Sequence, residues 1–114
     1  MATLRCGGDE LPVPFSNAFL AHLQLAVQER FAGNGGGFYL TGTYSSDGAQ
    51  TTTAHWVAPG VPLAFGYDVQ DGDGRAVAPV DIDRAQVDEL LSAMDRPTGV
   101  RCTESVWLPF VVPD

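Results

Sequence analysis

The sequence contains no lysine. All six of its basic residues are arginines, whereas 14 carboxylates give the chain a formal net charge of −8. Without an ε-amine the chain cannot form a Schiff base or a lysyl-nucleotide intermediate, and it cannot supply the lysine of a phosphate-binding loop. The negative charge also repels phosphate backbones and anionic lipid surfaces. We therefore expect neither a nucleic-acid partner nor a membrane partner.

Long apolar runs are also missing. No stretch approaches 18 uninterrupted apolar residues, and the first ten residues do not resemble a signal peptide. These absences predict a cytoplasmic location. In a reducing compartment Cys6 and Cys102 are expected to be free thiols, although a disulfide stays open if the first and last strands are neighbours. The absence of a C-x-x-C pair argues against a structural zinc site.

Three consecutive β-strands are predicted between Gly37 and Val69, where apolar and polar residues alternate. The strands cover residues 38–45, 51–58 and 61–69, and turn residues separate them. In the third strand every second residue is large and apolar, namely Val61, Leu63, Phe65, Tyr67 and Val69. Because alternate side chains of a strand share a face, we expect this face to pack on the core.

Two helices are predicted on either side of these strands. Ser16 is a good N-cap for a helix from Asn17 to Ala32, and Asp83 is spaced to cap a second helix that ends before Pro97. A helical wheel of the first helix places Leu20, Val27 and Phe31 on one stripe. It places His22, Leu25 and Glu29 on the opposite, polar side.

The resulting order is β-α-β-β-β-α-β, with a first strand at Thr3–Cys6 and a last strand at Val100–Ser105. This order predicts an α+β fold: an antiparallel sheet of four to five strands with both helices packed on one face. Residues 1–105 would form a single domain, and residues 106–114 an apolar C-terminal tail.

The sequence offers no convincing catalytic, cofactor-binding or metal-binding residue. Asp71-Gly72-Asp73-Gly74 matches only the first two ligand positions of an EF-hand loop and reads as a solvated turn. His55 has no second histidine at ligand spacing, and no G-x-S-x-G motif is present. We therefore expect no cofactor and no enzymatic activity. The alternative is a small enzyme or ligand-binding protein that uses His55 with a nearby Asp or Tyr.

Three segments resemble a known family. They are Pro14–Leu25, Trp56–Leu63 and Leu90–Val100, at intervals similar to those of a small uncharacterised actinobacterial family. The resemblance covers most of the chain up to about Glu104. Members of that family often carry the label ATP-dependent DNA ligase, but a ligase needs a nucleophilic lysine in a K-x-D-G context. Here the corresponding string is Val69-Gln70-Asp71-Gly72, so the label does not fit this chain.

The chain also departs from this family in two places. Family members have a basic turn after the first helix, where this chain has the neutral residues Gly33–Gly37. The apolar tail after Glu104 is extra. We therefore do not expect this chain to bind a partner that recognises the basic turn of other family members.

Large apolar residues outside the predicted core point to a protein interface. The candidate interface residues are Leu25, Trp56, Trp107, Leu108 and Phe110. The tail could add a strand to a neighbour's sheet, or it could fold over an edge of its own sheet. Both arrangements remain open.

These features predict a non-enzymatic cytosolic protein-interaction domain that binds a protein partner or a second copy of itself. An alternative is a small structural component of an actinobacterial virus particle, which Gly- and Thr-rich strands and an apolar arm would suit. If the tail carries the interaction, deletion of residues 106–114 should lower the oligomeric mass or abolish partner capture.

Overall fold

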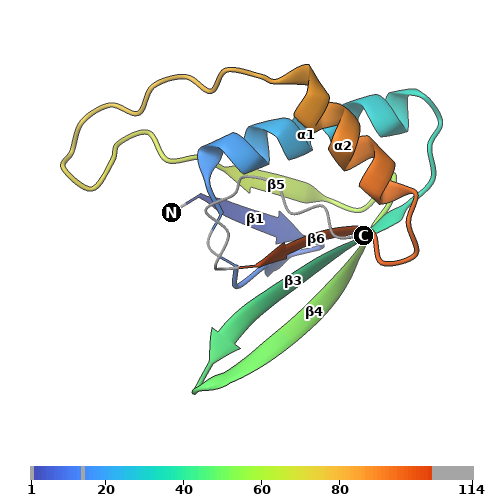
Figure 1. Ribbon diagram of the computed structural model, residues 1–114, viewed down its shortest axis with the longest axis horizontal. Coiled ribbons are helices and arrows are strands. Elements are labelled where there is room, and N and C mark those ends of the chain that lie inside the picture. The colour runs from blue at the N-terminus through green and yellow to red at the C-terminus, as the bar shows by residue number, and fades with distance from the viewer. Residues whose placement is uncertain (1, 14, 104–114) are drawn as a thin grey trace.

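The computed structural model describes residues 2–13 and 15–103. Over these residues the chain forms an α+β fold of two helices and six strands (Figure 1). The elements in chain order are β1 (Thr3–Cys6), β2 (Asp9–Glu10), α1 (Asn17–Ala32), β3 (Phe38–Ser46), β4 (Ala49–Val57), β5 (Leu63–Gly66), α2 (Arg84–Met94) and β6 (Val100–Thr103).

The described strands form two three-stranded sheets, so the predicted single antiparallel sheet is wrong. One sheet has the order β2-β1-β5 and is antiparallel, and the other has the order β4-β3-β6. In the second sheet β6 runs parallel to β3, with Val100 beside Leu40. A parallel neighbour requires a crossover connection, and here the chain between β3 and β6 includes α2. The class α+β is confirmed.

The third predicted strand leaves the sheet of its predecessors. After β4 the chain turns at Pro59-Gly60, where Gly60 has a φ of 94° and the amide of Val61 donates to the carbonyl of Ala58 at 3.0 Å. The chain then pairs as β5 with β1, with Phe65 opposite Leu4. Because β5 ends at Gly66, the expected apolar face also ends there. Leu63 and Phe65 pack against the core, whereas Tyr67 and Val69 are 38% and 77% exposed.

Both helices lie on the same side of the fold (Figure 1). As predicted, Ser16 caps α1, because its Oγ accepts a hydrogen bond from the amide of Phe19 at 3.1 Å. The Asp83 carboxylate caps α2 by accepting from the amide of Ala85 at 3.0 Å. An ion pair joins the two helices, since Arg84 Nη2 donates to Glu29 Oε1 at 2.7 Å. This pairing with Arg84 lowers the pKa of the Glu29 carboxyl.

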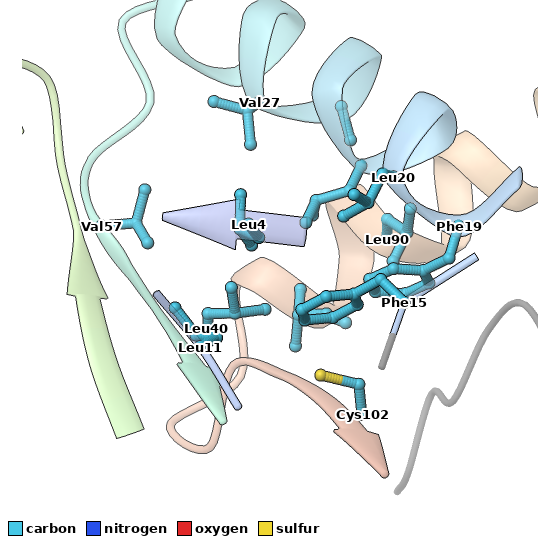
Figure 2. Close-up of a cluster of buried hydrophobic side chains, with 14 of the residues drawn as sticks. Leu4, Leu11, Phe15, Phe19, Leu20, Val27, Leu40, Val57, Leu90 and Cys102 are labelled. Carbon is cyan, nitrogen blue, oxygen red and sulfur yellow. The ribbon is translucent and has the colours of Figure 1, made fainter. Parts of the chain in front are cut away.

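One hydrophobic core fills the space between the helices and the two sheets. Its side chains come from α1, α2, β1, β3, β4, β6 and the segment before α1, and Figure 2 shows how they converge; they include Leu4, Leu20, Val27, Leu40, Val57 and Leu90. Truncating one such leucine to alanine costs about 2–5 kcal/mol in a well-packed core. The core therefore fixes the position of β3 and β4 relative to α2.

His22 lies on a buried face of α1, so its predicted place on the polar side is wrong. Its side chain is only 2% exposed. Nε2 accepts a hydrogen bond from the amide of Asp83 at 2.9 Å, and Nδ1 lies 2.6 Å from the carbonyl oxygen of Ala18. The wheel missed this because it assumed one covered face, whereas α1 packs on the core and also against the start of α2.

The two cysteines are free and buried. The Cys6 thiol donates to the carbonyl of Trp56 at 3.7 Å, and the Cys102 thiol to the carbonyl of Thr41 at 3.5 Å. Burial raises the pKa of Cys102 to about 12. Burial and the neighbouring Asp9 carboxylate also raise the pKa of Cys6. Both groups are therefore thiols, not thiolates, near neutral pH.

Candidate functional site

The outer face of the β4-β3-β6 sheet is the candidate functional site. It is organised by the hairpin of β3 and β4, whose two-residue turn Asp47-Gly48 has φ values of 52° and 80°. Positive φ at both central residues is the requirement of a type I′ hairpin turn, and the Asp-Gly pair is well suited to it. The register then runs without interruption from Ser46 opposite Ala49 to Phe38 opposite Val57.

Strand alternation divides the hairpin into two faces. Phe38 and Leu40 of β3 and Val57 of β4 are buried and face the core. The alternate residues Tyr39 and Trp56 lie opposite each other on the outer face. Their rings meet edge to face, with centroids 5.0 Å apart and planes at 62°. They stay 43% and 51% exposed, so this pair is a large aromatic surface in contact with solvent.

Gly37 makes room for the Trp56 indole. A Cβ atom at Gly37 would lie 2.4 Å from Cζ2 of Trp56 and 2.8 Å from the carbonyl oxygen of Val57. Any other residue at this position would have to displace the ring or the end of β4. The glycine backbone that precedes β3 therefore allows the exposed orientation of Trp56.

Two hollows flank the aromatic pair. The first has a volume of about 460 Å³ and lies over the middle of the sheet; its lining residues are Tyr39, Thr41, Ala54, Pro97, Thr98 and Arg101. The Thr41 hydroxyl donates to the carbonyl of Thr98 at 3.2 Å, which ties the α2–β6 connection to β3. The second, of about 330 Å³, lies toward the end of α2 and includes Arg30, Trp56 and Met94. Tyr39 and Pro97 line both hollows.

This face carries little negative charge, although the chain has a net charge of −8. Arg30, Asp95 and Arg96 line the second hollow, and Asp95 is paired with Arg30 at 2.9 Å. Along β3 and β4 the outward positions from Tyr39 to Ser45 and from Gln50 to Trp56 are aromatic, hydroxyl, amide or alanine side chains. On the described part of β6, Arg101 is the charged side chain of this face, and it is exposed. An acidic protein that approaches here meets little of the repulsion that the other surfaces exert.

Of the interface residues predicted from sequence, Trp56 lies at the centre of this face. Leu25 of α1 is partly buried and packs against the core. Trp107, Leu108 and Phe110 lie outside the described residues. The sequence reasoning missed Tyr39 and Arg101. The Asp-Gly turn could have revealed Tyr39, because a two-residue hairpin loop fixes which residue faces Trp56.

His55 lies on the opposite, inward side of β4, next to Leu40 of β3. Its Nδ1 is buried and has no hydrogen-bond partner among the described residues, and the same is true of Thr53 Oγ1. No group of three or more His, Cys, Asp or Glu side chains in the described part of the chain could hold a metal ion. Asp71 does form a turn, since its Oδ1 accepts from the amides of Asp73 and Arg75 at 2.8 and 3.0 Å.

The fold and this face define a small α+β domain whose main exposed feature is an aromatic sheet surface. A family model described as "Domain of unknown function (DUF7882)" matches residues 1–105. The chain therefore belongs to the DUF7882 family. No curated protein and no solved structure matches the chain. None of the helices within residues 2–13 and 15–103 is long and apolar enough to cross a membrane.

Proposed function

We propose that this protein is a non-enzymatic protein-interaction domain that binds through the outer face of the β4-β3-β6 sheet. The observation that carries the proposal is the exposed pair of Tyr39 and Trp56 on a surface with little negative charge. Tryptophan, tyrosine and arginine are the residues most enriched in the energetic centres of protein interfaces. All three occur here, with Arg101 bordering the hollow beside the aromatic pair.

The aromatic pair is suited to binding because its position is fixed before a partner arrives. Gly37 and the cross-strand register hold the Trp56 ring over Tyr39, so little side-chain freedom is lost on contact. The hollows on either side can receive side chains of the partner. The partner is a protein surface, which can be that of a second copy, and the setting we propose is the cytoplasm.

The alternative of a small enzyme or ligand-binding protein that uses His55 has less support. An acid or base must reach its substrate and needs a partner that tunes it. The His55 ring lies on the inward face of the hairpin, away from the two hollows described above. A His55→Ala variant that retains all measurable activity and ligand binding would remove this alternative.

The experiment that tests the proposal compares Trp56→Ala with Ile82→Ala. Ile82 is a matched control, because it is 47% exposed and lies in the segment before α2, away from the sheet. Wild-type and variant proteins are immobilised, and captured proteins from the host, including added soluble copies of this chain, are quantified by mass spectrometry. We expect Trp56→Ala to lose the specific partner and Ile82→Ala to retain it. Equal capture by both variants would contradict the proposal.

The tail needs a separate experiment, because residues 104–114 are outside the described structure. Deletion of residues 106–114 should lower the oligomeric mass or abolish capture if Trp107, Leu108 and Phe110 carry the contact. If capture survives the deletion but not Trp56→Ala, the sheet face alone is the binding surface.

A further inference from the structure

The hairpin has a second exposed feature, the free edge of β4. The proposed binding role of the outer face does not involve this edge. β4 is the first strand in the order β4-β3-β6, and its other edge pairs with no described strand. The strand is nine residues long, and its sequence AQTTTAHWV contains no charge and no proline. Its register with β3 has no bulge. Soluble proteins usually protect such edges with lysine, proline, bulges or a covering segment. None of the first three is present here.

The register shows which backbone groups point outward. In a two-residue hairpin the residues flanking the turn, Ser46 and Ala49, form a hydrogen-bonded pair, and hydrogen-bonded and non-hydrogen-bonded pairs then alternate. The amides and carbonyls of Thr51, Thr53 and His55 are therefore directed toward β3. Those of Gln50, Thr52, Ala54 and Trp56 are directed toward the open edge.

The body of the protein blocks the last of these positions. The carbonyl of Trp56 already accepts the Cys6 thiol at 3.7 Å, so β1 lies against this end of β4. At the other end the hairpin projects away from the helices into solvent (Figure 1). The accessible edge therefore consists of the outward groups of Gln50, Thr52 and Ala54, which are arranged symmetrically about Thr52.

We propose that the β4 edge binds a second copy of this chain by antiparallel pairing with a two-fold axis at Thr52. Gln50 then pairs with Ala54 of the second copy, Thr52 with Thr52, and Ala54 with Gln50, each pair exchanging two backbone hydrogen bonds. The β4-β3-β6 sheet of one copy and the same sheet of the second copy then form one continuous sheet of order β6-β3-β4-β4-β3-β6. The inference rests on the proposed interaction function and names a second copy as the partner.

The low charge of the hairpin favours a second copy at this edge. Two chains of charge −8 repel each other, but the hairpin from Phe38 to Val57 has a single carboxylate, Asp47. In the proposed register the two Asp47 residues lie at opposite ends of the paired strands, ten residues apart along the strand. That is about 34 Å, several times the Debye length of about 8 Å at physiological ionic strength.

The side chains across the new pairing are also compatible. On the outer face Thr52 meets Thr52, a type of cross-strand pair that stabilises sheets, and Gln50 meets the small Ala54. The chain already uses such a contact, because the hydroxyls of Thr43 and Thr52 lie 2.9 Å apart. On the inner face Thr53, whose Oγ1 has no partner among the described residues, lies opposite Thr51 of the second copy. The pairing ends before Trp56, because β1 lies against that end of β4.

The first test removes one outward amide. Ala54→Pro deletes an N–H that faces the open edge and leaves the hydrogen bonds to β3 intact, a position where edge strands accept proline. Ala54→Val is the matched control, since it keeps the N–H. We expect sedimentation equilibrium to show a dimer for the wild type and for Ala54→Val. In Ala54→Pro the dimer dissociation constant should rise at least about tenfold, the effect of losing roughly 1.4 kcal/mol.

The second test determines the register of the two paired β4 strands. It remains valid if the proline variant does not fold. Thr52→Cys places two cysteines across the two-fold axis with Cα atoms about 5.5 Å apart, within disulfide range. Gln50→Cys, on the same exposed face, leaves the cysteines roughly 14 Å apart along the strand. Mild oxidation should give a covalent dimer of Thr52→Cys and none of Gln50→Cys.

Three outcomes would overturn the inference. None of them decides the proposed function, which has its own test. A wild-type protein that stays monomeric at all concentrations rules out the pairing. So does equal cross-linking of the two cysteine variants. A dimer that survives in folded Ala54→Pro but disappears when residues 106–114 are deleted assigns self-association to the tail. The Trp56→Ala capture experiment is independent of all three.

Discussion

At the scale of single residues, the close approach of Gly99 to β3 determines whether the parallel strand can form. Gly99 has a φ of 67°, and a Cβ atom there would lie 1.9 Å from the carbonyl oxygen of Tyr39. The clash is with backbone and no side-chain rotation relieves it. The position therefore requires glycine for two independent reasons, the backbone conformation and the contact.

Replacing Gly99 by alanine should lower the free energy of unfolding by about 2 kcal/mol or more, since both strain and a steric clash are introduced. Gly36→Ala is the matched control, because a Cβ atom there meets nothing within 4 Å. Urea unfolding followed by circular dichroism measures both. Equal midpoints for the two variants would show that the α2–β6 connection does not hold β6 against β3 as described.

The Cys102 thiol provides a pH-dependent test of burial. Its ordinary pKa is 9.0, and burial raises it to about 12 in the folded protein. Between these values the unfolded chain loses this proton while the folded chain keeps it, so the free energy of unfolding falls as the pH rises through this window. Below about pH 9 the thiol contributes no pH dependence.

We therefore expect the wild type to lose stability more steeply than Cys102→Ala between pH 9 and the upper limit of the folded state. Native protein at pH 8 should also react slowly with a thiol reagent, and unfolded protein quickly, because the thiolate is the reactive form. Parallel stability curves of the two proteins, or rapid labelling of native Cys102, would contradict its described burial.

At the scale of secondary-structure elements, local sequence was sufficient for the helices and insufficient for strand partners. The helix from Asn17 to Ala32 was predicted with its observed bounds, because a cap and an apolar stripe mark it locally. The strand Thr3–Cys6 was also predicted correctly. The pairing of β5 with β1 and of β6 with β3 was missed, because partners are chosen by packing between segments that are about 60 residues apart.

The outer face could be predicted only in part, because it combines a local hairpin with a strand that is distant in the sequence. Trp56 was predicted as an interface residue, and its partner Tyr39 follows from the hairpin register. Arg101, Pro97 and Thr98 reach the face only because β6 lies beside β3 in parallel orientation, and nothing in the local pattern indicates that. Leu25 packs partly against the core, which a helical wheel does not show because it cannot indicate how far the core extends around α1.

The contact between α1 and α2 depends on a buried imidazole. His22 accepts from the amide of Asp83, the N-cap of α2, and the imidazole itself is buried. His22→Leu should fill similar space but leave that amide without a partner, which costs about 1–3 kcal/mol. Gln28→Leu on the exposed side of α1 is the control and should be nearly neutral. Chemical unfolding of the two variants with indistinguishable midpoints would remove this role of His22.

At the scale of the whole molecule, the net charge of −8 opposes association of identical chains. The sheet face, which has little negative charge, and the β4 edge, which has none, are the places where we expect this opposition to be weak. Screening lengths shrink from about 30 Å at ~0.01 M salt to about 10 Å at ~0.1 M. Self-association should therefore strengthen as salt is raised over this range, which sedimentation velocity can follow. Weakening with salt would indicate an interface held by ion pairs and not the sheet face or β4 edge described here.

If other protein surfaces bind around Trp56, site-specific photocrosslinking from that position will capture them. A photoreactive phenylalanine analogue is placed at position 56 in one protein and at position 82 in another, and both are irradiated in their host cells. We expect a discrete protein adduct, with a second copy or another protein, from position 56 and none from position 82. The same adducts from both positions, or adducts from position 82 alone, would contradict it.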